Sequence, residues 1–214
     1  MFSFRCYFGQ KQATAFINEV HYQNFLADLS EFVEVAYTTS YNLAGHRLFF
    51  YNSAGASYKE TDEILATPLA ITNEAAGFIF TSLSVYQVTN EVINTNGGIA
   101  LIGPNDVVVD FISYGIAITA TSGPANGTTS TLMGVTEPAN TGPANSLQLG
   151  GTGFQKADFT WQQPQRSTPG NLNTGQTILC PTGEATPVRV NTKRTADEIV
   201  THLQGIDIEF NNDD

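Results

Sequence analysis

The alternation of hydrophobic and polar positions predicts a chain built from short β-strands. The clearest pair lies in residues 97–115, where the apolar runs 99–102 and 107–112 flank a turn sequence at 103–106. Pro104 presets φ for the first corner of such a turn, and the Asn and Asp side chains that follow bond to nearby backbone. We therefore expect a tight antiparallel hairpin. Its second strand is apolar on both faces, which places it inside a sheet rather than at an edge.

The same alternation assigns faces to individual strands. A strand at 31–37 would carry on one face Glu31, Val33, Val35 and Tyr37, and on the other Phe32, Glu34 and Ala36. The second hairpin strand would carry on one face Val107, Val109 and Phe111, and on the other Val108, Asp110, Ile112 and Tyr114. Each strand thus has one face suited to a core between two sheets.

Further strands are expected at 13–22, 46–51, 57–65, 77–81, 146–149 and 158–162. Eight or nine short strands with turn signals between them, and almost no helical periodicity, indicate a two-sheet antiparallel β-sandwich. Trp161 is expected to pack at the edge of the core. Residues 120–145 are long, polar and rich in Thr, Gly, Pro, Ser and Asn, which predicts a loop that is functional or decorates the surface.

The sequence changes character after Gly175, and we divide the chain into an N-terminal extension (1–12), a sandwich domain (13–178) and a linker with a tail (179–214). Thr195 and Glu198 form a capping box, and Ile199 and Leu203 make an apolar stripe, which predicts a short helix at 195–205. Residues 206–210 alternate like a strand. The sequence leaves three alternatives for the tail: it docks on its own domain, it joins a partner, or it begins a further domain.

Composition excludes some classes of partner. The 214 residues include 20 acidic and 9 basic side chains, a net charge of −11. Phosphate backbones repel such a chain, so we expect no direct nucleic-acid binding. The sequence contains no run of 18 apolar residues, so it predicts no membrane-spanning helix. Residues 1–10 lack the basic and apolar regions of a signal peptide. If the protein is secreted, three explanations are open: the signal peptide was removed, the numbering begins after it, or export uses another route.

The two cysteines, Cys6 and Cys180, lie one near each end of the chain. In a secreted protein they would form a disulfide that joins the two ends. Two unrelated free thiols are an equal alternative.

The sequence carries little catalytic chemistry. His21, His46 and His202 are isolated, and no zinc-protease, nucleophile-elbow or phosphate-loop motif occurs, so we assign no catalytic residues and expect no enzyme. The best candidate site is a calcium site made by Glu19, Asp28 and Glu31, with Glu34 close by, because calcium prefers hard oxygen ligands where strands and a loop meet. The alternative is that Glu31 and Glu34 cap loops or accept bonds from backbone amides.

Several motifs occur together in one order along the chain. They read FINEVHY at 16–22, EFVEV at 31–35, LAGH at 43–46, GIAL at 98–101, VVDFISY at 108–114, SLQLGGTG at 146–153, DFTW at 158–161, TPG at 168–170 and NTGQ at 173–176. Over residues 15–177 the chain thereby resembles the lamin tail domain family, in the branch found in secreted bacterial proteins. The resemblance implies an all-β, immunoglobulin-like antiparallel β-sandwich, here followed by a short C-terminal helical tail.

The resemblance also implies an accessory module rather than a catalyst. We expect a non-catalytic extracellular or cell-surface interaction and assembly module, secreted or held at the cell surface. Its protein partners, or further copies of itself, would bind through loop 120–145 and the C-terminal tail. A free strand edge pairing with residues 206–210 of a neighbour is one route to assembly. The alternative is an accessory domain that positions substrate for a secreted nuclease or other hydrolase.

Overall fold

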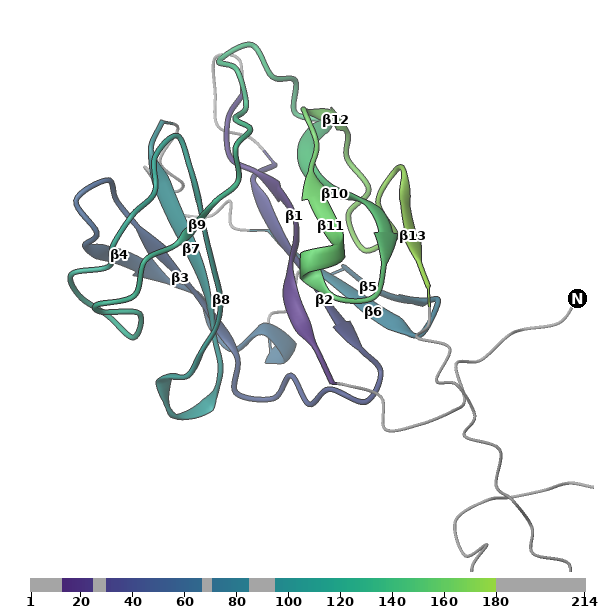
Figure 1. Cartoon of the computed structure of the whole chain (residues 1–214), viewed down its shortest axis with the longest axis horizontal. Helices are drawn as coiled ribbons and strands as arrows, with labels where there is room; N and C mark the ends of the chain where they lie inside the picture. The colour runs from purple at the N-terminus through teal and green to yellow at the C-terminus, as the bar shows by residue number, and fades with distance from the viewer. Residues whose placement is uncertain (1–12, 25–29, 67–70, 85–94, 180–214) are drawn as a thin grey trace, which may run out of the picture. The chain divides into compact units, whose positions relative to one another are not determined.

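Two β-sheets pack face to face in this computed structural model, which describes residues 13–24, 30–66, 71–84 and 95–179 (Figure 1). All of them belong to one compact unit, Met1–Thr182. Sheet A has the strand order β11-β10-β1-β2-β6-β5, with β12 and β13 also paired to β10, and sheet B has the order β4-β3-β7-β8-β9. Pairing is antiparallel except between β10 and β13 and between β8 and β9. The predicted all-β sandwich is therefore confirmed.

The strands and short helices have the following bounds. Sheet A contains β1 (Ala15–His21), β2 (Phe32–Thr38), β5 (Ile71–Ala75), β6 (Phe78–Ser84), β10 (Asn145–Gly153), β11 (Phe159–Trp161), β12 (Gln165–Arg166) and β13 (Gln176–Ile178). Sheet B contains β3 (Arg47–Tyr51), β4 (Ser57–Glu60), β7 (Gly97–Ile102), β8 (Val108–Tyr114) and β9 (Thr131–Leu132). Three 3₁₀ turns connect strands: η1 (Ile64–Ala66), η2 (Pro104–Asp106) and η3 (Lys156–Asp158).

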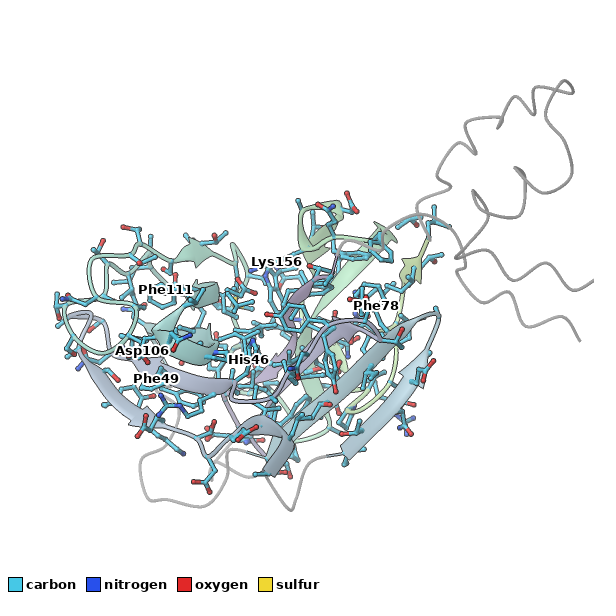
Figure 2. All side chains as sticks on the ribbon, turned by 90° about the horizontal axis from the view of Figure 1, so that it is seen from below. His46, Phe49, Phe78, Asp106, Phe111 and Lys156 are labelled. Atoms are coloured by element: carbon cyan, nitrogen blue, oxygen red, sulfur yellow. The ribbon has the colours of Figure 1, made fainter. Side chains whose placement is uncertain are left out.

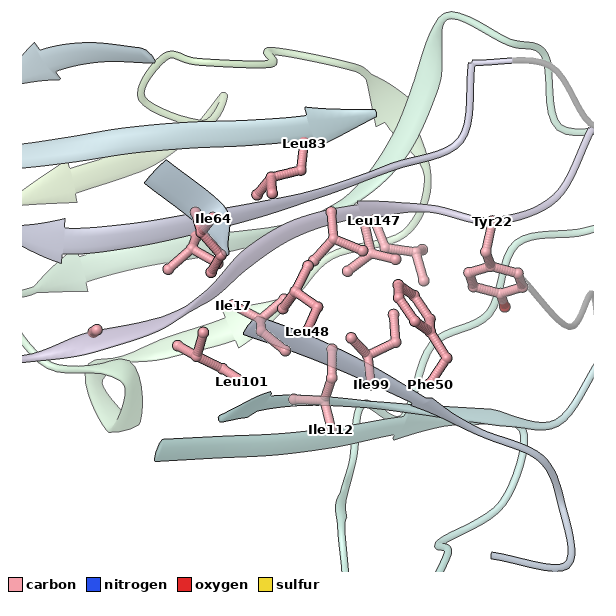
Figure 3. Packing of buried hydrophobic residues seen from close by; sticks show 14 of the residues in the cluster. Ile17, Tyr22, Leu48, Phe50, Ile64, Leu83, Ile99, Leu101, Ile112 and Leu147 are labelled. Atoms are coloured by element: carbon pink, nitrogen blue, oxygen red, sulfur yellow. The ribbon is translucent and has the colours of Figure 1, made fainter. Parts of the chain in front are cut away.

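Apolar side chains form three clusters, so both sheets are covered on both faces. The central core lies between the sheets and includes Ile17, Val35, Leu48, Phe50, Ile99, Leu101, Ile112 and Leu147 (Figure 3). A B-side cluster on the outer face of sheet B contains Phe49, Tyr51 and Phe111, and an A-side cluster on the outer face of sheet A contains Phe16, Phe78 and Phe80. Figure 2 shows Phe49 and Phe111 on one side of the molecule and Phe78 on the other. Trp161 packs against both the central core and the A-side cluster, as expected for the edge of the core.

The hairpin of β7 and β8 forms around η2, as the apolar runs predict, but the faces predicted for β8 are wrong at its start. A bulge lies opposite Leu101 and Ile102, which pair with Asp110 and Val108 respectively. Val109 therefore packs against the central core and not beside Phe111, which lies in the B-side cluster with Val108. A bulge inserts one residue into a strand and reverses the alternation from that point, so a strict period of two fails there.

Loop 120–145 is not simply a surface decoration, which corrects the prediction for its first half. Residues 116–130 fold back over the outer face of sheet B and bury Ile118, Ala120 and Ala125 in the B-side cluster. The segment returns on itself through the bonds Ala120 N–H to Thr128 O and Gly127 N–H to Ala120 O. The turn at Gly127 has open space around it, since a Cβ there would meet nothing within 4 Å.

Other sequence predictions were wrong in their bounds or lie outside the described residues. The strand predicted at 57–65 ends at Glu60, and Ile64 then turns into the central core from η1. β5, which the sequence does not distinguish, forms a hairpin with β6. The helix predicted at 195–205 and the strand at 206–210 lie outside the described residues.

Candidate functional site

Glu19, a predicted calcium ligand, is buried on β1 and is bonded to donors of the chain itself. It follows a bulge between Ile17 and Glu19 and pairs with Gln148 of β10 on one side and Glu34 of β2 on the other. Its Oε1 accepts bonds from Ser146 Oγ (2.5 Å), Gln148 Nε2 (3.1 Å) and the Thr168 N–H (2.8 Å), and its Oε2 accepts one from Thr168 Oγ1 (2.9 Å). Burial raises the pKa of this carboxyl, and these four bonds oppose the rise.

Glu34 is also buried, directly across from Glu19. Its Oε1 accepts a bond from Asn18 Nδ2 at 2.9 Å, and its Oε2 accepts one from the Gly170 N–H at 2.6 Å. Burial, reinforced by the negative charge of Glu19, raises the pKa of Glu34 well above its ordinary value. The bond to Gly170 confirms the alternative of a backbone-amide acceptor for this residue.

Both carboxylates hold down one segment, residues 165–178, which we call the strap. The strap begins as β12, which pairs with β10. It then crosses the outer face of sheet A and pairs with β10 again as β13. Asn173 Nδ2 donates to the carbonyls of Asn18 and Leu149, and Gln176 Nε2 donates to Asn18 Oδ1 at 2.8 Å. The site is therefore a buried polar network that fixes a loop on a sheet.

Of the remaining predicted site residues, the structure describes only Glu31. Glu31 is buried at the start of β2, where its charge contributes to raising the pKa of His21. Asp28, Cys6 and Cys180 lie outside the described residues. Among the residues that the structure describes, no group of three or more His, Cys, Asp or Glu side chains is placed to hold a metal ion. Because four N–H and O–H groups of the chain already donate to Glu19, we do not assign it as a metal ligand.

His21 belongs to a second buried network that anchors the segment around Glu137. His21 Nδ1 bonds Glu137 Oε1 at 2.9 Å, and His21 Nε2 bonds Asn24 Oδ1 at 3.1 Å. Glu137 Oε2 accepts the N–H groups of Tyr22 (2.7 Å) and Gln23 (2.8 Å), and the Glu137 N–H donates to the Tyr22 hydroxyl. Burial lowers the pKa of His21, but the hydrogen bond to Glu137 and its charge outweigh that effect and raise it. This network is enclosed by protein, so it is structural.

His46 and Asp110 are fixed by local contacts as well. His46 Nδ1 lies 3.1 Å from the Ala44 carbonyl, so it carries the proton, and Nε2 accepts the Tyr41 hydroxyl at 2.9 Å. Asp110 on β8 accepts the Ile17 N–H at 3.0 Å and an ion pair from Lys156, and so links β8 of sheet B to β1 and η3. His46 and the Asp110–Lys156 ion pair lie in separate contacts, and none of these contacts contains a serine, threonine or cysteine nucleophile.

The longest run of exposed residues within a described strand lies on β5, the last strand of sheet A. Residues 71–74 are exposed, with Ile71 at 52 %. β5 has five residues, against four for β4, three for β11 and two for β9, the other strands that end the two sheet orders. It contains no Lys, Arg or Pro, the residues that commonly block sheet edges.

The turn before β6 identifies which backbone groups of β5 face outward. Ala76 and Gly77 have φ of +52° and +81°, the geometry of a two-residue type I′ turn. In such a hairpin the residues that flank the turn, Ala75 and Phe78, form a hydrogen-bonded pair, and pairs alternate from there. Thr72 and Glu74 therefore direct their N–H and C=O groups away from β6. These groups form the candidate interaction site, which the sequence missed because β5 has no apolar alternation.

Comparison with known proteins adds no neighbour. No family model, no curated protein and no solved structure matches the chain. No helix among the described residues is long and apolar enough to cross a membrane. The resemblance to the lamin tail domain family therefore remains a prediction from the sequence motifs.

Proposed function

We propose that this chain is a non-catalytic interaction and assembly module of the lamin tail type, acting outside the cell or at its surface, and that it binds an extended strand along the β5 edge. The observation that carries the proposal is the exposed edge itself. Strand addition needs a row of outward N–H and C=O groups, which Thr72 and Glu74 provide. The buried carboxylates and histidines, by contrast, are bonded within the fold.

The partner that we propose is a second copy of the chain, which would add its residues 206–210 as the new strand. Residues 206–210, which lie outside the described residues, read Ile-Asp-Ile-Glu-Phe and alternate apolar with acidic side chains. Ile71, Asn73 and Ala75 share the face of β5 that continues the A-side cluster, so the apolar side chains of an added strand would extend that cluster. The acidic side chains would lie on the face that carries Glu74.

Light scattering of the full chain over a range of concentrations tests this proposal. Thr72→Pro removes an outward N–H without breaking the ladder to β6, and we expect it to abolish self-association. Thr72→Ala keeps that N–H and is the matched control, so it should associate like the unmodified chain. A synthetic peptide of residues 205–212 should compete. A chain that stays monomeric, or a Thr72→Pro variant that associates normally, would refute the proposal.

A further inference from the structure

One residue of the strap connects a buried carboxylate to the candidate edge. Gly170 donates its N–H to Glu34 Oε2 at 2.6 Å, and its carbonyl accepts Asn73 Nδ2 of β5 at 2.9 Å. Its φ is +74°, and a Cβ at this position would lie 2.6 Å from Ile71 Cγ2. The strap therefore closes against β5 at the point where it is bonded to Glu34.

Among the residues that the structure describes, no cation is paired with the carboxylate under the strap. Glu34 lies in register with Glu19, and the groups that donate to the two carboxylates are neutral: Asn18, Ser146, Gln148, Thr168 and Gly170. β6 and β10 carry no titratable side chain. The other titratable side chains of β1, β2, β5 and the strap are bonded elsewhere, lie on the opposite face or are exposed: His21, Tyr37, Glu74 and Arg166. Two like charges thus meet in a buried site when both groups ionise.

We propose that Glu34 is a proton-controlled latch for the strap: the strap stays closed on sheet A while the Glu19–Glu34 pair holds a proton, and it opens when both carboxyls are ionised. Opening returns Glu34 to water and separates its negative charge from the protein interior. It also releases Asn73 and uncovers the side of β5 against which Gly170 packs. The role of the latch at the β5 edge rests on the proposed function, whereas the latch itself does not.

The direction follows from proton linkage. With the strap closed, burial and the charge of Glu19 raise the pKa of Glu34, and with the strap open the group returns toward its ordinary value of 4.5. The closed state therefore binds the proton more tightly, and closure is favoured at acidic pH. The equilibrium constant for opening rises up to about tenfold per pH unit between 4.5 and the raised pKa, and it is constant above that pKa.

Hydrogen exchange of the full chain tests the latch at a series of pH values from about 4 to 8, with the intrinsic exchange rates divided out. The protection of the Thr168 and Gly170 amides should fall by up to about tenfold per pH unit and then level off. Glu34→Gln cannot ionise at the position that holds the Gly170 amide, so the pH slope of Gly170 protection should be clearly smaller in this variant than in the unmodified chain, while Glu19 still titrates beneath Thr168. Glu74→Gln removes a charge on the other face of sheet A and should keep the slope of the unmodified chain. The proposal is overturned if strap protection does not change with pH in the unmodified chain, or if Gly170 protection has the same pH slope in Glu34→Gln as in the unmodified chain.

A second measurement needs no variant. A carbon-13 NMR titration of the Glu34 carboxyl in the unmodified chain should show its midpoint above 4.5, in the pH range where strap protection changes. A midpoint at the ordinary value overturns the latch. Light scattering over the same pH range then separates the two proposals. Strap opening without any self-association refutes the β5 assembly and leaves the latch standing. Self-association with pH-independent strap protection refutes only the latch.

Discussion

Replacing Glu137 by glutamine is expected to remove the charge from its pair with His21 while the hydrogen bonds survive. In the folded protein, Glu137 accepts from His21 Nδ1 and from two backbone N–H groups, and His21 Nε2 donates to Asn24 Oδ1. Glutamine keeps a carbonyl oxygen for the two N–H groups and turns its NH₂ toward His21. A neutral imidazole protonated on Nε2 accepts that NH₂ at Nδ1 and still donates to Asn24.

The consequence is a change in how stability depends on pH. The pKa of His21 is raised in the folded state, because the effects of Glu137 outweigh burial, which lowers it. A raised histidine pKa adds stability that is fully present below the unfolded value of 6.5 and is lost as pH rises through the folded value. The contribution is about 1.4 kcal/mol for each unit between the two values. Glu137→Gln should lose this contribution, so it is less stable than the unmodified chain below pH 6.5 and nearly equal to it at alkaline pH.

Urea unfolding at pH values from about 5 to 9 measures the effect, with Glu137→Ala as the comparison. Alanine leaves His21 and the N–H groups of Tyr22 and Gln23 without their acceptor, so we expect a loss of about 3–5 kcal/mol at acidic and neutral pH. If Glu137→Gln keeps the pH dependence of the unmodified chain between pH 6 and 9, the charged pair is not its source. If it is as destabilised as Glu137→Ala at pH 9, the proposed exchange of hydrogen bonds is wrong.

Three further substitutions test other contacts. Gly170→Ala places a Cβ against Ile71 at a positive φ and should cost about 1–3 kcal/mol in urea unfolding, with the largest loss of hydrogen-exchange protection in the strap. Ala76→Gly relieves a φ of +52° in the turn between β5 and β6 and should stabilise the fold by up to about 1 kcal/mol, seen as a higher melting temperature. Asp110→Ala leaves the Ile17 N–H without its acceptor and should cost about 1–3 kcal/mol, whereas a lowered stability of under 0.5 kcal/mol would show that water replaces the carboxylate.

Much of the sandwich could be predicted because its strands bury one face in a shared core. Val33 and Val35 point into the central core as their spacing requires, and the hairpin of β7 and β8 forms where the turn residues place it. The failures have local physical causes. A bulge in β8 moves Val109 to the other face, and β5 lacks an apolar alternation, since four of its five residues are exposed.

The buried networks around Glu19 and Glu137 were harder to predict because their contacts join distant parts of the chain. Glu19 was selected as a carboxylate near a loop, but its donor Thr168 lies 149 residues further along. Glu137 has no local motif, and its role depends on Tyr22, which is 115 residues away. No sequence spacing reveals such pairs without an alignment. The sequence shows the residue types. It does not show the contacts that decide whether a carboxylate accepts hydrogen bonds or binds a metal.

The turn at Gly127 has a practical consequence for engineering. Residues 116–130 pack onto sheet B through Ile118, Ala120 and Ala125, and the bonds between Ala120 and residues 127 and 128 close the base of the turn. The side of Gly127 where a Cβ would lie is open, because such an atom would meet nothing within 4 Å. A foreign peptide grafted between Asn126 and Gly127 would thus be displayed on a closed base, which makes the sandwich a scaffold with a built-in presentation loop.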